Sequence, residues 1–270
     1  MHDRDARRFM PGAGPVTVDQ LRDGEPYELH EGRPIYVAPT GADGTWRVTL
    51  GSQILNTDPQ VKKAGVEAGY ALDEHTLRAP DIAVGDMPDA PGWIKGAPLL
   101  AVEYASTGQD EAQLQLKIKE LLTAGTRYVW VVRLLGVRRV EIHEPGAPMR
   151  VAQIGEELLA PEVLQNPIPV EAMFEPSVAH DMTLRNLLQR KGYRDLDDLR
   201  ETERKEGRQQ GFEDGQVQTL RSALQTILNT RGLAMGPAES ERMASCRDVA
   251  LLERWLGRAV TARTAPEVFE

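Results

Sequence analysis

The chain has 270 residues, of which 41% are hydrophobic and 27% are charged, an ordinary globular composition that allows one large core and a smaller second unit. It contains no run of about 18 apolar residues, so we expect no membrane span, and its charged beginning lacks the apolar stretch of a secretory signal. The single cysteine, Cys246, excludes a disulfide framework and a cysteine-rich zinc site. A reducing cytoplasm is therefore the expected compartment.

The net charge of −9 is unevenly distributed along the chain. Residues 1–175 hold 17 Lys and Arg against 26 Asp and Glu, whereas residues 176–270 hold 15 of each kind. Because phosphate affinity comes mainly from Lys and Arg, this balance disfavours nonspecific coating of a polyanion. A metal site lined by carboxylates is compatible with it.

Residues 1–19 show no periodic pattern and predict a loose arm, with Thr17 capping a helical turn near its end. Apolar spacing and turn residues then predict a series of helices and strands. These are a hairpin turning at Gly32, a helix over 46–55, strand-like runs over 65–72, 79–84 and 99–104, a helix over 110–123, a strand over 128–132, and a strand over 137–143 that pairs with it. The order predicts an α/β domain over residues 20–175, a mixed sheet flanked by helices.

Beyond this domain the composition changes. We predict a linker and a long polar helix over 176–216, followed by a small all-α domain over 217–270. Gly207, Gly211 and Gly215 share one face of the polar helix, and glycine costs a helix about 1 kcal/mol relative to alanine. The close approach of a second helix would offset that cost.

Two arrangements of this C-terminal region are open. The polar helix runs into an apolar stretch with heptad-like spacing, made of Leu220, Leu224, Ile227 and Leu228. Pairing with the same helix of a second chain would give a homodimer. In the alternative, residues 233–270 fold back over the apolar stretch, and the glycine-containing part is a flexible tether.

Two carboxylates stand at the ends of predicted strands. Asp81 directly precedes the apolar run 82–84, and Glu103 lies near the end of the run 99–104. If these strands are neighbours, both carboxylates converge at one edge of the sheet, where they would bind a hard divalent cation such as Mg²⁺. The alternative is that Asp81 caps a turn and Glu103 is exposed to solvent.

The helix over 110–123 offers a cation to the same edge. At about 100° per residue, Lys117 lies about 80° from the centre of the apolar stripe of this helix. From that border position its long side chain can bend over the sheet edge toward Glu103. Lys119 faces outward and is interpreted as a solvent-exposed residue.

A set of short motifs in a fixed order carries a resemblance to a known family. The motifs are Tyr27-Glu28-Leu29 with Gly32, Pro80-Asp81, the Glu-x-x-Ser of Glu103 to Ser106, a helix with Lys117, Ala124-Gly125, and Tyr128-Val129-Trp130-Val131-Val132. Over about residues 20–175 the chain resembles the Uma-two-type restriction endonuclease family, which belongs to the PD-(D/E)XK nuclease superfamily. The expected fold is therefore a restriction-endonuclease-like mixed sheet flanked by helices.

The resemblance implies metal-assisted hydrolysis of phosphodiester bonds in DNA, with Mg²⁺ or Mn²⁺ as the cofactor. It implies that Asp81 and Glu103 hold the metal and that Lys117 orients water or stabilises developing charge. Glu28 is a candidate outer acid, and its alternative is a glutamate on a surface hairpin. Ser106 is interpreted as the cap of the following helix.

The chain also departs from the family pattern around these residues. Thr45 stands in place of a common His, Gln113 in place of an acid, Leu121 in place of a Tyr and Arg133 in place of an Asp. The superfamily's usual lysine position is Ala105. Two hypotheses remain: an active endonuclease, and a catalytically decayed nuclease fold that acts as an oligomerising interaction or regulatory module.

Four arginines and the C-terminal tail complete the sequence predictions. Arg127, Arg133, Arg138 and Arg139 surround the hairpin over 128–143, where they would track a phosphate backbone or form a solvated strand face. The tail motifs are Arg231-Gly232-Leu233, Cys246-Arg247-Asp248, Leu252-Glu253-Arg254-Trp255-Leu256 and Pro266-Glu267-Val268-Phe269. They resemble the helical tail of Rpn-type recombination-promoting nucleases, which implies dimerisation through the C-terminal helices or docking to a protein partner.

Overall fold

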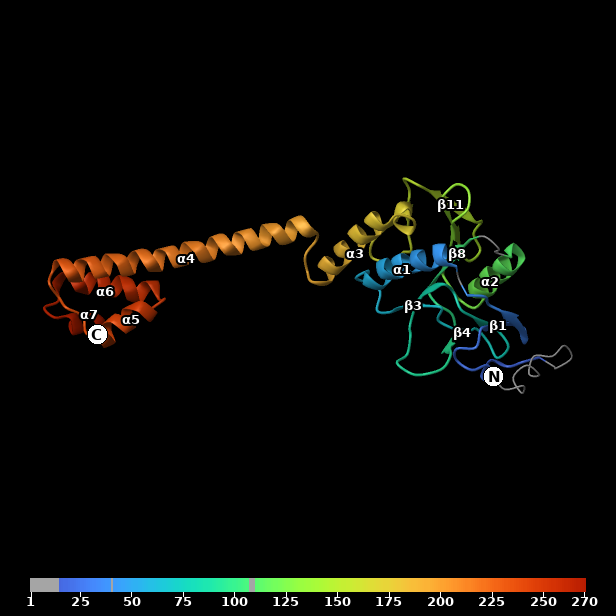
Figure 1. The fold of residues 1–270 in the computed structure, drawn as a ribbon, viewed down its shortest axis with the longest axis horizontal. Helices are drawn as coiled ribbons and strands as arrows, with labels where there is room; N and C mark the ends of the chain where they lie inside the picture. Colours follow the sequence, from blue (N-terminus) through green and yellow to red (C-terminus); the bar gives the residue numbers. More distant parts are fainter. Residues whose placement is uncertain (1–14, 40, 107–109) are drawn as a thin grey trace. The chain divides into compact units, whose positions relative to one another are not determined.

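The computed structural model describes residues 15–39, 41–106 and 110–270. Its contacts divide the chain into two units, Met1–Asp195 and Leu196–Glu270 (Figure 1). Among the described residues, no helix combines the length and the apolar character needed to cross a membrane. The first unit is α/β and the second is entirely helical, as the sequence predicts.

A six-stranded mixed sheet forms the centre of the first unit, in the order β11-β10-β9-β8-β6-β3. Its strands are β3 (Ala64–Val66), β6 (Ile82–Val84), β8 (Leu100–Ala105), β9 (Tyr128–Arg133), β10 (Arg139–His143) and β11 (Arg150–Gln153). Only β8 and β9 run parallel, and α2 (Glu111–Thr123) connects them. All other neighbours in this sheet are antiparallel.

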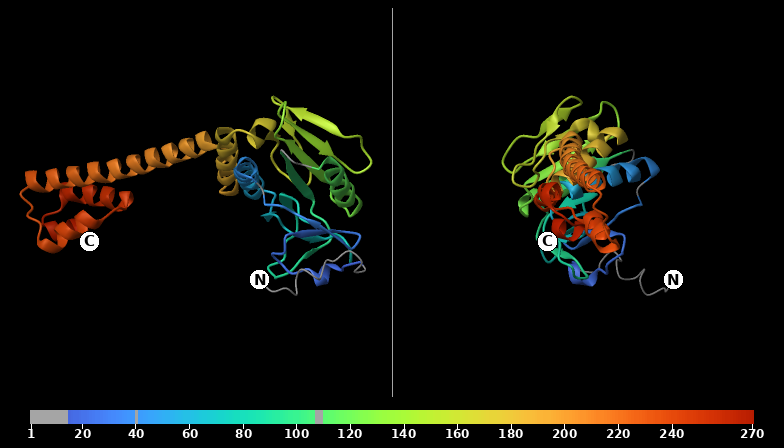
Figure 2. Two further views of the ribbon diagram at one scale, coloured as in Figure 1. Left: turned by 45° about the vertical axis from the view of Figure 1, so that its right-hand side comes forward. Right: turned by 90° about the vertical axis from the view of Figure 1, so that its left-hand side faces the viewer.

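Helices cover both faces of this sheet. Along β8, Val102 and Tyr104 belong to the core shared with α1 (Ala42–Thr57), whereas Ala101 and Ala105 pack with α2. The alternation follows from the two-residue period of a strand. Figures 1 and 2 show α3 (Pro176–Arg190) beside α1, on the α1 side of the sheet.

A second, smaller sheet adjoins the main one and has the order β2-β1-β5-β4-β7. Its strands are β1 (Tyr27–His30), β2 (Arg33–Tyr36), β4 (Tyr70–Ala71), β5 (Leu77–Arg78) and β7 (Ile94–Lys95). The predicted hairpin is confirmed: β1 and β2 pair through a turn in which Gly32 has φ of 76°. A third pair, β12 (Glu157–Leu158) and β13 (Ile168–Pro169), is followed by the 3-10 helix η2 (Val170–Met173).

The prediction of a loose N-terminal arm is wrong for its described part. Residues 1–14 lie outside the described residues, but Val16 and Val18 are buried against Leu29 and Leu77 of the small sheet. The turn after Thr17 is the 3-10 helix η1 (Val18–Gln20). Burial of these two valines fixes the chain to the hairpin.

Two predicted strand runs are interrupted where the chain passes between the two sheets. The run over 65–72 becomes β3 and β4, because the chain turns at Glu67, which has φ of 52°, and at Gly69, which packs against the Trp93 ring. The run over 79–84 forms a strand only over its second half, as β6, and its first three residues connect β6 to β5 of the small sheet. Continuous apolar character predicts a strand but does not reveal a sharp turn within it.

The first unit extends to Asp195 rather than to residue 175, so residues 176–190 are not a linker. On α3, Ala179 and Met182 enter the main core. The buried Asn186 donates to the carbonyl of Ile54 at 3.0 Å. The guanidinium of Arg190 binds four carbonyl groups at the end of α1 and just beyond it, those of Asn56, Thr57, Asp58 and Val61. Helix α3 therefore closes the C-terminal end of α1.

The second unit is a small helical domain made of α4 (Leu196–Thr230), α5 (Pro237–Ser245), α6 (Val249–Thr261) and α7 (Ala265–Phe269). Its core joins Leu224 and Leu228 of α4 to Leu252, Trp255 and Phe269. The apolar stretch of α4 is therefore covered by the chain's own α6 and α7. It is not available as the seam of a homodimer, which corrects the expectation based on its heptad-like spacing.

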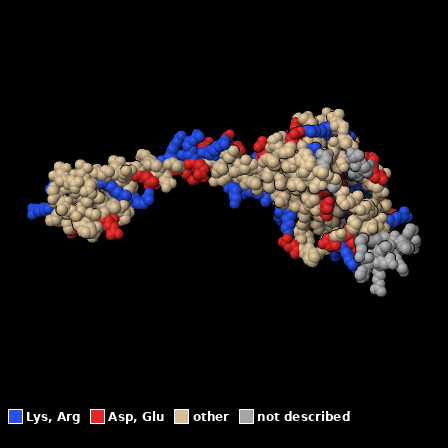
Figure 3. Space-filling view, in the orientation of Figure 1, with Lys and Arg blue, Asp and Glu red and all other residues tan. Residues whose placement is uncertain are grey.

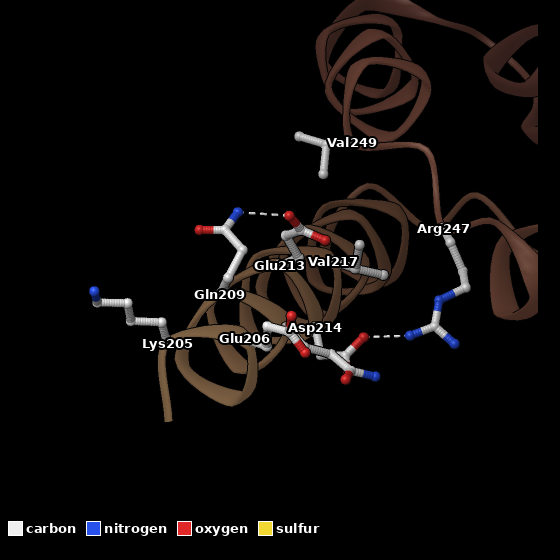
Figure 4. Close-up of a pocket in the computed structure, with 9 residues that line it drawn as sticks. Lys205, Glu206, Gln209, Glu213, Asp214, Val217, Arg247 and Val249 are labelled. Atoms are coloured by element: carbon white, nitrogen blue, oxygen red, sulfur yellow. Dashed lines mark hydrogen bonds and ion pairs between the residues drawn. The ribbon is translucent and has the colours of Figure 1, made fainter. Parts of the chain in front are cut away.

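The first half of α4 has no such cover. Residues 203–216 are exposed, and a Cβ atom added to Gly207, Gly211 or Gly215 would meet no atom within 4 Å. Figure 3 shows basic and acidic side chains lying together along this part of the helix. A polar hollow follows, in which Arg247 points to Asp214 and Gln209 to Glu213 (Figure 4).

Candidate active site

Asp81 and Glu103 lie opposite each other on neighbouring strands. Strands β6 and β8 are antiparallel, with Ile82 facing Val102, and the same register continued by one residue sets Asp81 against Glu103. Residues directly opposite each other in an antiparallel pair project from the same face of the sheet. The Tyr104 N–H donates to Asp81 Oδ2 at 2.6 Å, which fixes the Asp81 carboxylate at the end of β8.

Lys117 extends from α2 to the same place. Its Nζ lies 2.7 Å from Glu103 Oε1 and 3.0 Å from Glu28 Oε1. It also donates to the carbonyl of Ala79 at 2.8 Å, two residues before Asp81. Lys119, two residues further along the helix, is exposed. The helix thus delivers one ammonium group to the carboxylates and leaves the other in solvent.

Glu28 is part of this cluster and is 5% exposed, so the alternative of a surface hairpin glutamate is wrong. Its Oε1 accepts the Ala79 N–H at 3.0 Å, and its Oε2 accepts from Arg78 at 2.8 Å. Strand β1 pairs with β5, which brings the hairpin next to the turn that carries Asp81. A short apolar strand interrupted by one acid gave no signal that the acid points inward.

Three residues of the cluster were not predicted from the sequence. Arg78 is 1% exposed and lies 2.5 Å, through Nε, from Glu120 Oε2. His30 Nδ1 lies 2.5 Å from the other oxygen of Glu120. Two of them could have been suspected from their closeness in sequence to predicted site residues. Arg78 stands three residues before Asp81, and Glu120 stands one helical turn after Lys117. Their mutual contact depends on how the two sheets meet.

Burial and the charges of neighbouring acids raise the pKa values of the two opposed acids. Burial raises the pKa of Glu103 to about 8, the charges of Asp81 and Glu28 add to the rise, and Lys117 opposes it. Burial also raises the pKa of Asp81, against the effect of Lys117 and of the Tyr104 N–H. Without a bound cation, simultaneous ionisation of these two carboxyl groups is therefore unfavourable.

Glu28 and Lys117 shift toward their charged forms. Burial opposes ionisation of Glu28, but Lys117 and Arg78 hold its pKa below the usual range. Burial alone would lower the pKa of Lys117, yet Glu103, Glu28 and Asp81 raise it well above its usual value. Lys117 is therefore a permanent cation at neutral pH.

The cluster carries more acid than base. It contains the four carboxyl groups of Glu28, Asp81, Glu103 and Glu120 and the two cations Arg78 and Lys117. With every carboxyl ionised, the carboxylates exceed these two cations by two negative charges in a buried place, which a divalent cation would neutralise. Within the described ranges, no group of three or more His, Cys, Asp and Glu side chains is arranged to hold a metal ion. Two opposed carboxylates suit Mg²⁺, which keeps several water ligands.

The four arginines around the β9–β10 hairpin all form ion pairs with acidic side chains. Arg133 binds Glu111 through two hydrogen bonds of 2.8 Å and Glu141 at 2.7 Å. The other three pairs are Arg127 with Glu162, Arg138 with Glu175, and Arg139 with Glu141. Pairing of this kind favours the interpretation as a strand face over a phosphate track.

One of the smaller predictions around α2 is wrong. The N-cap of α2 is Asp110, whose Oδ1 accepts the Gln113 N–H at 3.1 Å, and not Ser106. Leu121 is fully buried in the core under α2. The position at which the family commonly has a tyrosine therefore serves packing in this chain.

Comparison with known proteins assigns a family to the first unit. The profile of the family described as Uma2, putative restriction endonuclease, matches residues 16–171. A solved structure of a putative nuclease belonging to DUF820 from Anabaena variabilis is similar, with a TM-score of 0.53 and 20% sequence identity. The alignment covers 61% of this chain and 99% of that one. No curated protein matches the chain.

Proposed function

Because the chain belongs to the Uma2 family of putative restriction endonucleases, we propose that it is a Mg²⁺-dependent endonuclease that hydrolyses phosphodiester bonds of DNA. Its active site comprises Asp81, Glu103 and Lys117, with Glu28 as an outer acid. Both the nuclease fold of the similar structure and the family support nuclease chemistry. Mn²⁺ would replace Mg²⁺, since both prefer oxygen ligands.

One observation carries the proposal: a buried ammonium lies 2.7 Å from a buried carboxylate at the sheet edge where a second carboxylate stands opposite. Asp81 and Glu103 are the residues that would hold the cation. When bound, Mg²⁺ lowers the pKa of a water molecule and neutralises charge on the scissile phosphate. Asp81, Glu103 and Lys117 come from three separate segments of the sequence, the residue before β6, the strand β8 and the helix α2.

The protein side chains have separate tasks in this proposal. Lys117 stays protonated and places a fixed positive charge where a phosphate oxygen gains negative charge. Glu28 and the carbonyl of Ala79 restrict the Lys117 ammonium to one position. The Tyr104 N–H restricts Asp81 in the same manner. Preorganisation of this kind avoids rearrangement of dipoles during the reaction.

Cleavage of DNA by the purified full-length chain tests the proposal. With Mg²⁺ or Mn²⁺, we expect Asp81→Asn and Lys117→Met to reduce the rate about 100-fold or more. Lys119→Met is the matched control, because Lys119 lies on the same helix and is exposed, and it should retain the wild-type rate. Equal rates for all four proteins would assign the activity to a contaminant or to another site.

The competing function is a decayed nuclease fold that acts as an interaction or regulatory module. It is favoured by the arginines around the β9–β10 hairpin, whose charges are matched by glutamates instead of being presented to a phosphate backbone. A wild-type protein that neither binds Mg²⁺ or Mn²⁺ nor cleaves nucleic acid would establish this second function.

We further propose that the chain forms a homodimer through the exposed half of α4. The open face of Gly207, Gly211 and Gly215 is the feature that supports it, together with the marginal stability of an isolated polar helix. A dimer would place two nuclease units in one particle, one for each strand of DNA. A protein partner docking on the second unit is the alternative.

A further inference from the structure

Arg78 is the most deeply buried charged residue near the proposed site. It belongs to β5 of the small sheet, and its side chain is 2% exposed. A guanidinium group in such a place is costly unless its charge is paired and its donors are bound. Two carboxylates pair its charge: Nη1 donates to Glu28 Oε2 at 2.8 Å, and Nε donates to Glu120 Oε2 at 2.5 Å. The remaining nitrogen, Nη2, is buried and has no hydrogen-bond partner among the described residues.

Both partners of Arg78 are connected to Lys117, one by an ion pair and the other through the helix α2. The second oxygen of Glu28 lies 3.0 Å from Lys117 Nζ. Glu120 stands on α2 one turn after Lys117, on the same side of the helix. Arg78 therefore joins the hairpin that carries Glu28 to the helix that carries Lys117.

The planar guanidinium group fixes the directions in which Arg78 can bind Glu28 and Glu120. Its donors diverge at fixed angles, so a single side chain sets the positions of two carboxylates at once. Lys117 in turn divides its contacts between Glu28 and Glu103. If Glu28 lost its bond to Arg78, its uncompensated charge would draw Lys117 away from Glu103.

We infer that Arg78 is a positioning residue, which acts through Glu28 and Glu120 to hold the Lys117 ammonium against Glu103. The inference rests on the proposed function, because it assigns to Arg78 the placement of a proposed catalytic group. Arg78 itself does not touch the reacting atoms. A purely structural role, in which the ion pairs only stabilise the junction of the two sheets, is the competing explanation.

The test compares Arg78→Lys with the wild type and with a matched control. Lysine retains the charge but loses the diverging donors. Arg190→Lys is the control, since Arg190 also binds several groups at once, in the same unit, but at the end of α1. Both variants should lose some thermal stability. Only Arg78→Lys should lower kcat, by about 100-fold, with KM for DNA changed less than twofold.

A second measurement reports on Lys117 without any need for activity. The NMR signal of the Lys117 ammonium is assigned by its disappearance in Lys117→Arg. We expect the signal to shift in Arg78→Lys, to shift in the same direction in Glu120→Gln, and to stay in place in Arg190→Lys. The Glu120 variant keeps the size of the side chain, removes its charge and replaces one acceptor oxygen by an amide donor.

The outcomes separate the inference from the function on which it rests. Failure of the wild type to cleave DNA with Mg²⁺ or Mn²⁺ overturns the proposed function. An unchanged Lys117 signal in folded Arg78→Lys overturns the positioning by Arg78, whether or not cleavage occurs. A fall in kcat no larger than the loss of folded protein also overturns it, in favour of the structural role.

Discussion

The acid–base state of one residue, Glu103, links metal binding to proton release at the proposed site. Burial raises its pKa to about 8, against 4.5 for an ordinary glutamate, so this carboxyl group favours its protonated form at neutral pH when no cation is bound. A cation binds the ionised form, so binding must displace the proton. Affinity for Mg²⁺ is therefore expected to fall as the pH decreases below about 8.

Isothermal titration calorimetry checks this prediction. Between pH 8 and pH 6 we expect the apparent affinity for Mg²⁺ to decrease by about tenfold per pH unit, and titrations in buffers of different ionisation enthalpy should reveal the released proton. Glu103→Gln should abolish binding, while Glu111→Gln, at an exposed acid outside the cluster, should not change it. An affinity independent of pH across this range would contradict the prediction.

At the scale of elements, the contact between α1 and α3 depends on polar side chains inside the first unit. Asn186 is 1% exposed, donates to Ile54 O at 3.0 Å and accepts from Asn166 at 2.9 Å. Asn186→Leu retains the branched shape of the side chain but removes its hydrogen bonds with both groups. We expect a loss of about 3 kcal/mol in the free energy of unfolding.

Leu187→Asn provides the control for this change. Leu187 is the next residue on α3 and is 47% exposed, so its substitution should alter stability by about 0.5 kcal/mol or less. Urea unfolding, followed by hydrogen exchange of the main-sheet strands, measures both variants. Equal stability of Asn186→Leu and the wild type would show that the buried amide does not hold α3 on α1.

The sequence predicts elements best where periodicity is simple. The helix over 110–123 was expected from its apolar stripe, which also placed Lys117 at the border of that stripe and within reach of Glu103. In contrast, α3 was missed because Asn186 and Arg190 do much of its packing, and polar residues leave no hydrophobic period. The sequence left two alternatives for Glu28 and did not single out Arg78, because the burial of both depends on the meeting of two sheets.

At the scale of the whole molecule, the proposed homodimer makes a specific prediction for the exposed half of α4. If a second helix packs on the glycine face, a side chain at Gly211 blocks its approach. Gly211→Gln should then convert a dimer into a monomer. Gln210→Ala, a change at the neighbouring exposed position, should leave the dimer intact.

Light scattering on the full chain at tens of micromolar measures both variants and the wild type. A monomeric wild-type protein would remove the homodimer proposal. The second unit would then be a docking module for another protein. The covered apolar stretch of α4 gives no support to either outcome, since its leucines already pack with Trp255 and Phe269.

The closure of α1 by Arg190 has a consequence for how this chain can be divided and recombined. The family match ends at residue 171, but a nuclease unit cut there would lose α3 and leave the four carbonyl groups that Arg190 binds without that donor. The junction at which one C-terminal module can be exchanged for another therefore lies between Asp195 and Leu196. Transplanting the nuclease unit onto a different tail requires residues that the shared family pattern does not contain.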